Sequence, residues 1–173
     1  MNDIKTPGKG RDVARRIVDE LTECDVKLVA SLPDNWLTDV ITEIDGDPRI
    51  RHVPVNREES AIGLCAGAFM GGQGSVALMG ASGLMTCIYA ITKINYSYEI
   101  PLLLLTTLRG GFGDHHKHHI SNGLYLQPVL QALDMPYIVI SKPEDLTEIR
   151  RAYHHSRTFS RPTVVALTRD LLR

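Results

Sequence analysis

The sequence is poor in cysteine, which limits both its covalent chemistry and its location. Cys24, Cys65 and Cys87 are the three cysteines of the 173 residues, and they are far apart and odd in number. They form neither a disulfide framework nor a CxxC metal-binding pair. Cys65 and Cys87 lie within apolar helical patterns, so we expect them to be small buried hydrophobes. A reducing, cytoplasmic location is therefore expected.

Long hydrophobic runs are missing as well. The N-terminal stretch MNDIKTPGKGRDVARR lacks the apolar core of a signal peptide, and no run reaches the roughly 18 residues that cross a bilayer. The longest run, IPLLLLTTL, has the length of a buried strand. We therefore expect no membrane association.

The chain also lacks an excess of charge of one sign. Its 19 basic and 20 acidic residues leave a formal net charge of −1. No overall field favours nucleic acid or an anionic membrane surface as a partner. The densest basic segment, RRIVDELTECD, also carries acids and is typical of a solvated helix face.

What the sequence does contain is a regular alternation of strand and helix patterns. We expect a flexible lead-in over residues 1–9 and one domain over residues 10–173. The expected strands are Lys27–Ser31, Ile50–Val55, Ser75–Met79, Pro101–Thr107, Tyr137–Ile140 and Thr163–Leu167. The expected helices are Gly10–Glu23, Trp36–Ile44, Arg57–Met70, Gly83–Ile94, Leu124–Leu133 and Pro143–Thr158. This alternation predicts the α/β class, with a six-stranded parallel sheet and helices on both faces in three layers.

Ligands of open parallel sheets bind at the carboxyl ends of the strands, so the segments that follow the strands are the places to search. These segments are SLPDNW, VNREES, GASGLM, TLRGGFGDHHKHHISNG and SKPED. The stretch Leu108–Gly123 shows little periodicity. A loop of that length in a compact domain is usually functional or mobile.

Two adjacent acids, Glu58 and Glu59, begin a helix that is otherwise almost entirely apolar. Asn56 and Glu59 have the spacing of a capping box, which gives Glu59 a sufficient structural role. Glu58 is not needed for that box, although the helix dipole favours an acid in the first turn. A helix that packs closely would hold Glu58 in poorly solvated surroundings, where its carboxyl group is suited to share a proton with a basic heterocycle.

Four histidines, His115, His116, His118 and His119, fall within five residues of the long loop. A zinc site is one alternative, but adjacent histidines of one short loop rarely reach one ion with tetrahedral geometry, and no cysteine is nearby. An exposed polar loop without a role is a second. The third is substrate handling, because imidazole exchanges protons near neutral pH and binds anions.

Two further polar residues follow buried strands. Asp34 fits a helix N-cap. Arg109, in the sequence LRGG, is either a surface arginine or a residue that binds a carboxylate, sulfonate or phosphonate by a forked pair of hydrogen bonds.

These stretches together resemble the pyrimidine-binding domain of thiamine-diphosphate-dependent decarboxylases. NREESAIGLCAGAFMGGQGSVALM is similar to the glutamate-bearing helix of that family, and alignment on Gly63 and Gly67 places the family's glutamate on Glu58. SLPDNWL, GASGLM, IPLLLLTTLRGG, HISNG and PVLQALDMPY resemble further segments of phosphonopyruvate and sulfopyruvate decarboxylases, in the same order. The resemblance extends over Asp12–Leu172.

The resemblance implies a mechanism. The glutamate of this family hydrogen-bonds N1′ of the aminopyrimidine, and the cofactor accepts the electrons left when a 2-keto acid loses CO₂. It implies Glu58, His119 and, as second choice, His116 as catalytic residues. It implies cofactor contacts from Ser82, Gly83 and Leu84, and substrate contacts from Asp34, Arg109 and His115. ASGLMT lacks the two asparagines common at this point in related decarboxylases, which leaves the identity of the substrate open.

The sequence lacks the GDG motif that holds the diphosphate and Mg²⁺ in this family. The similar DGDP of Asp45–Pro48 does not replace it, because it lies in the N-terminal half and is followed by a strand. The chain therefore resembles the alpha subunit of a split enzyme, whose beta subunit carries the diphosphate half. The resemblance implies an α₂β₂ or larger assembly and a chain that is inactive alone. It implies sulfopyruvate as the first-choice substrate and phosphonopyruvate as the second. A non-catalytic assembly subunit of the same fold and a monomeric ligand-binding domain remain alternatives.

Overall fold

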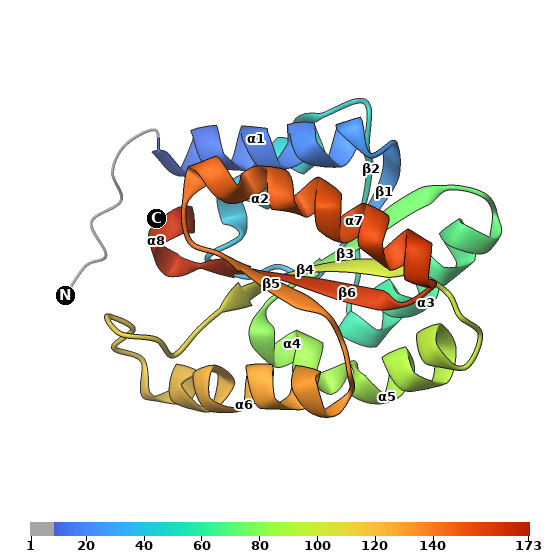
Figure 1. Cartoon of the computed structure of the whole chain (residues 1–173). Helices are drawn as coiled ribbons and strands as arrows, with labels where there is room; N and C mark the ends of the chain where they lie inside the picture. Colours follow the sequence, from blue (N-terminus) through green and yellow to red (C-terminus); the bar gives the residue numbers. More distant parts are fainter. Residues whose placement is uncertain (1–8) are drawn as a thin grey trace.

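A computed structural model describes residues 9–173, and Figure 1 shows their arrangement. The lead-in expected over residues 1–9 lies outside the described residues except for Lys9, at which helix α1 begins. No helix in the described part of the chain is both long enough and apolar enough to span a membrane.

The predicted parallel sheet is confirmed. Its strands are β1 (Val26–Ser31), β2 (Arg51–Pro54), β3 (Gly74–Met79), β4 (Leu102–Leu108), β5 (Tyr137–Ile140) and β6 (Pro162–Thr168). They pair in the order β2-β1-β3-β4-β6-β5, and each neighbouring pair is parallel. The connection direction reverses between β1 and β3, which makes the carboxyl ends of these two strands the switch point where such sheets bind ligands.

Helices cover both faces of the sheet, which gives the predicted three layers (Figure 1). The helices are α1 (Lys9–Glu23), α2 (Thr38–Gly46), α3 (Glu58–Met70), α4 (Ala81–Thr86), α5 (Ile88–Ile91), α6 (Ile120–Ala132), α7 (Glu148–Phe159) and α8 (Arg169–Leu172). A π-helical turn, Thr92–Tyr96, follows α5, and 3₁₀ turns at Lys117–His119 and Pro143–Thr147 precede α6 and α7. Helices α1, α2 and α7 lie on one face, and α3 to α6 lie on the other.

Each face of the sheet has its own apolar core. Side chains alternate along the central strands, so that Leu103 packs toward α1 and α7 while Leu104 packs toward α3 and α6. The three cysteines are free and buried, as expected for Cys65 and Cys87. Burial raises the pKa of the Cys65 thiol to about 12, which leaves it protonated and unreactive.

The helix predicted over residues 36–44 is shifted to Thr38–Gly46, the one predicted over residues 143–158 begins with a 3₁₀ turn, and two others differ more from the structure. The helix expected over residues 83–94 is divided into α4, α5 and the π-helical turn, which places the fully buried Asn95 amide where it donates to the Ile100 carbonyl at 3.0 Å. Helix α6 begins at Ile120 rather than at Leu124. Gly123, which the sequence pattern assigns to the loop, lies within α6. Its lack of a side chain lets the helix approach the backbone at Arg109, where a Cβ would lie 2.7 Å from the carbonyl oxygen.

Candidate functional site

Polar side chains that follow three different strands gather at the carboxyl edge of the sheet. Asp34 follows β1, Glu58 follows β2, and Arg109 follows β4. The carboxyl group of Asp34 lies against Gly80, at the end of β3, where a Cβ atom would be 3.3 Å from the Asp34 Cγ. The site is therefore centred on the switch point between β1 and β3.

Asp34 shapes the turn that leaves β1. Its Oδ1 accepts a hydrogen bond from the backbone N–H of Trp36 at 2.8 Å. The residue that caps α2 is Leu37, and the helix begins at Thr38. The N-cap interpretation of Asp34 is therefore wrong, because this carboxylate stabilises a turn three residues before the helix.

Arg109 is a buried partner of Asp34. Its side chain is 5% exposed, and its Nη2 donates to Oδ1 of Asp34 at 2.5 Å and to Oδ1 of Asn35 at 2.7 Å. Its guanidinium group also stacks 4.0 Å above the Trp36 ring. The surface interpretation of Arg109 is wrong. The nearby carboxylate compensates its charge, so Arg109 is not a free anion receptor in this state.

His119 continues this network into the loop. Its Nε2 lies 3.4 Å from Nη1 of Arg109, and its Nδ1 lies 2.8 Å and 2.9 Å from the two carboxylate oxygens of Asp114. Burial alone would raise the pKa of Asp114, but the Gly110 N–H and His119 together hold that pKa well below its usual range. Asp114 was missed by the sequence analysis, since only its place at the head of the histidine run distinguishes it.

The other predicted loop histidines are less embedded. The side chain of His116 is 61% exposed, and its ring lies 5.0 Å from that of His119. His115 is exposed and has no hydrogen bond or ring contact to any residue in the described range. His118, which was not chosen as a site residue, lies closer to His119, with ring centroids 4.3 Å apart.

One donor atom each from Asp114, His116 and His119 lies within 4.8 Å of the others, which is close enough to consider a metal ion. Two observations disfavour a metal ion at this position. The facing atoms of Asp114 and His119 already hydrogen-bond to each other, and the Arg109 guanidinium places a positive charge 3.4 Å from the His119 ring. The arrangement of these three groups therefore disfavours a bound metal ion.

The two acids at the start of α3 have different surroundings. The residue that caps α3 is Arg57, in an extended conformation and without a side-chain cap hydrogen bond. The capping box predicted for Asn56 and Glu59 is therefore not formed, because the helix begins one residue later than that spacing requires. Glu59 instead accepts a hydrogen bond from Arg57 at 3.3 Å.

Glu58 is half-buried and packs against α4. A Cβ atom on Gly83 would lie 2.5 Å from the Glu58 Cγ and 2.8 Å from its Cδ, so only glycine admits this approach. Glu58 has no hydrogen-bond or ion-pair partner among residues 9–173. Ser82, beside Gly83, is exposed, while Leu84 is fully buried in the core. Of the three predicted cofactor contacts, Ser82 offers an exposed hydroxyl group, Gly83 lies against Glu58, and Leu84 is part of the core.

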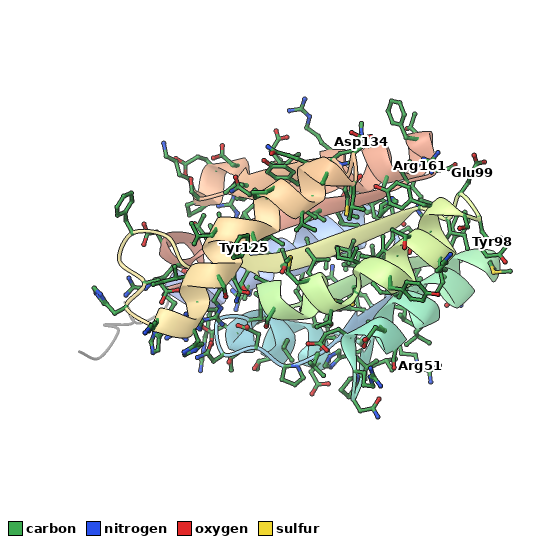
Figure 2. The ribbon with its side chains drawn as sticks, turned by 90° about the horizontal axis from the view of Figure 1, so that it is seen from below. Arg51, Tyr98, Glu99, Tyr125, Asp134 and Arg161 are labelled. Carbon is green, nitrogen blue, oxygen red and sulfur yellow. The ribbon has the colours of Figure 1, made fainter. Side chains whose placement is uncertain are left out.

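Cavities occur at both ends of the strands. A cavity of about 160 Å³ adjoins the loop and includes Trp36, Phe112 and Asp114 in its lining. A larger one, of about 750 Å³, includes Asp134 and Arg161 and contains no predicted site residue. Figure 2 shows these two residues at the end of the molecule away from the histidine loop. The larger cavity is therefore separate from the site.

Comparisons with known proteins were made for sequence and for structure. No family model matches the chain. The alpha subunit of sulfopyruvate decarboxylase from Methanococcus maripaludis is 34% identical over 120 residues, which cover 69% of this chain and 72% of the relative. The alpha subunit from Methanocaldococcus jannaschii is 29% identical over 156 residues, covering 90% of this chain and 92% of the relative.

Two more distant likenesses cover only part of larger proteins. Phosphonopyruvate decarboxylase from Streptomyces viridochromogenes is 32% identical over 81% of this chain, but that region is 35% of the relative. A solved structure of 2-oxoglutarate:ferredoxin oxidoreductase from Magnetococcus marinus superposes with a TM-score of 0.71 over 94% of this chain and 29% of that chain, at 14% identity, which supports the fold alone. On the identity and coverage of the sequence relatives, the chain belongs to the family of sulfopyruvate decarboxylase alpha subunits.

Proposed function

We propose that this chain is the alpha subunit of a split, thiamine-diphosphate-dependent decarboxylase that converts sulfopyruvate to sulfoacetaldehyde and CO₂. The observation that carries the proposal is Glu58, a half-buried acid without a partner among the described residues, held against Gly83 at the ligand-binding edge of the sheet. The names of the relatives support sulfopyruvate as the substrate.

The surroundings of Glu58 fit a heterocycle with a basic ring nitrogen. An unpaired carboxyl group needs a hydrogen-bonding partner, and the missing Cβ of Gly83 leaves the space that the Glu58 side chain occupies. Thiamine diphosphate, when bound, supplies the electron sink that accepts the electron pair of the broken C–C bond. Glu58 is the group that exchanges a proton at N1′ of the aminopyrimidine. Ser82 and Gly83 lie next to it, and the buried Leu84 supports this turn from the core.

The opposite side of the site handles the substrate in this proposal. Arg109 and Asp34 form a buried pair that fixes the position of His119. His119 then moves a proton at Nε2 during the reaction, with His116 beside it and His115 at the exposed part of the loop. The compensated charge of Arg109 assigns it to orienting neighbours rather than to binding the sulfonate alone.

The beta subunit is proposed to supply the Mg²⁺ and diphosphate site and to complete an α₂β₂ or larger assembly. The names of the relatives, which include the word alpha, support a second subunit. The outer side of α3 is consistent with a covering chain, because Gly63 and Gly67 face open space and Met70 is 78% exposed. A cytoplasmic location is part of the same proposal and agrees with the free cysteines.

The test is co-expression with the candidate beta subunit, followed by a CO₂-release assay. The assay compares sulfopyruvate, phosphonopyruvate and pyruvate, with and without thiamine diphosphate and Mg²⁺. We expect cofactor-dependent turnover of sulfopyruvate by the complex and none by this chain alone. Preferred turnover of phosphonopyruvate would select the second-choice substrate. A stable complex that releases no CO₂ from any of the three would favour the non-catalytic assembly subunit.

A further inference from the structure

We propose that Asp114 is a positioning residue for His119, which it holds through Nδ1 in one ring orientation and one tautomer, with Nε2 directed at the Arg109–Asp34 pair. The catalytic part of this inference rests on the proposed function. The geometric part concerns the chain itself and is tested separately.

The carboxylate of Asp114 is fixed on several sides. Its side chain is 3% exposed. Its Oδ2 accepts from the Gly110 N–H at 3.0 Å, and its Oδ1 accepts from the His116 N–H at 3.2 Å. Both oxygens also lie within 2.9 Å of Nδ1 of His119. A carboxylate held by two backbone donors cannot rotate freely, so it sets the plane in which the imidazole lies.

The chemistry of the partners determines where the proton of His119 resides. The pKa of Asp114 lies well below its usual range, mainly because the Gly110 N–H and His119 outweigh the effect of burial, so the carboxylate stays ionised near neutral pH. An ionised carboxylate only accepts hydrogen bonds, which assigns the proton to Nδ1. On the other side of the ring, a guanidinium group only donates, which leaves the lone pair of Nε2 facing Arg109.

The result is a directional chain of donors and acceptors. Arg109 donates to Asp34 and to Nε2 of His119, and Nδ1–H of His119 donates to Asp114. The charged or titratable groups that face the His119 ring are Asp114, Arg109 and the rings of His116 and His118, and the Trp36 ring lies edge-on with centroids 6.1 Å apart. In this tautomer His119 accepts a proton from the substrate at Nε2, in place of the hydrogen bond from Arg109, and Asp114 balances the charge of the imidazolium that forms until the proton is returned.

The closing experiment uses the full chain and its complex with the beta subunit. ¹⁵N spectra of the histidine rings report the tautomer, and the His119 signals are assigned by their loss in His119→Gln. Asp114→Asn keeps the size of the side chain but removes its charge. Asp134→Asn is the matched control, because Asp134 is exposed, lies at the opposite end of the molecule and has a φ of 49°, which asparagine tolerates.

We expect wild-type His119 to carry its proton on Nδ1, and Asp114→Asn to mix the two tautomers. In the complex, Asp114→Asn lowers kcat by about 10²-fold, the cost of a catalytic group misplaced by about 1 Å, while KM changes little. Asp134→Asn changes neither the spectrum nor kcat.

A purely structural role of Asp114 in the loop predicts a different pattern, with a lower unfolding temperature but an unchanged tautomer and an unchanged kcat of the folded fraction, and that result overturns the proposal. A wild-type His119 protonated on Nε2 alone overturns it without any variant. If the wild-type complex does not decarboxylate sulfopyruvate, the proposed function fails, while the ring spectra still decide the geometric inference.

Discussion

Glu58 and the Arg109–His119 network lie at the same edge of the sheet, but their hydrogen-bonding states are opposite. Glu58 is half-buried against Gly83 and has no hydrogen-bond or ion-pair partner among residues 9–173. By contrast, Arg109 binds Asp34 and lies within 3.4 Å of His119, and His119 in turn binds Asp114. One side of the site is thus open to a partner from outside the chain, and the other is already saturated.

This difference indicates how the two sides act. A polar group that is left partly buried without a partner costs free energy, which binding of a complementary ligand recovers. A saturated network instead fixes its members before the ligand arrives, which lowers the cost of ordering them during the reaction. We therefore propose cofactor recognition for Glu58 and substrate positioning for Arg109 and His119.

The largest effect on stability is expected on the saturated side. Arg109→Met leaves the carboxylate of Asp34, which is 16% exposed, without its cation, and breaking such a buried pair costs about 3–5 kcal/mol. Arg151→Met is the control, because Arg151 is 76% exposed and pairs with Glu148 at the surface, where such a pair contributes less than about 1 kcal/mol. Urea unfolding measures both. Equal costs for the two variants would contradict the description of Arg109 as a buried partner.

An intermediate effect, on activity alone, is expected from Gly83→Ala. The new Cβ displaces the Glu58 side chain, and a shift of about 1 Å in a catalytic group costs about 10²-fold in kcat. The fold itself should tolerate alanine in a helix. Gly46→Ala is the matched control, because a Cβ at Gly46, at the end of α2, meets no atom within 4 Å. Unchanged turnover in Gly83→Ala, or an equal loss in Gly46→Ala, would show that the contact with Glu58 does not matter.

The smallest effect is expected one residue away from Glu58. Glu59→Gln removes only an exposed contact with Arg57, so the free energy of unfolding should change very little. Turnover of the complex should be unchanged. If this variant instead loses turnover, the catalytic role belongs to Glu59, and the sequence alignment that selected Glu58 is wrong by one residue.

The sheet was predictable because its signals are local. Apolar runs such as Leu102–Leu105 show strands buried on both faces without reference to the rest of the chain. Strand ends therefore located Asp34, Glu58 and Arg109 at one edge. Their roles remain predictions, since position at an edge does not establish chemistry.

The pairings within the site were not predictable, because they join segments that are distant in sequence. Arg109 and Asp34 are 75 positions apart in the sequence, and nothing in the residue types indicates that they form a pair. Asp114 is distinguished only once the loop is folded around its carboxylate. The helix at Gly123 illustrates the same limit, since a close approach of two backbones overrides the low helix propensity of glycine.

The most direct test of the central claim asks whether Glu58 contacts N1′ of the cofactor ring. Thiamine diphosphate is compared with an analogue that carries carbon in place of N1′, in wild-type, Glu58→Gln and Glu59→Gln complexes. We predict that the analogue and Glu58→Gln each lower turnover by about 10²–10⁴-fold, that their combination lowers it little further, and that Glu59→Gln shows no such coupling. Independent, additive losses from the analogue and Glu58→Gln would contradict the account.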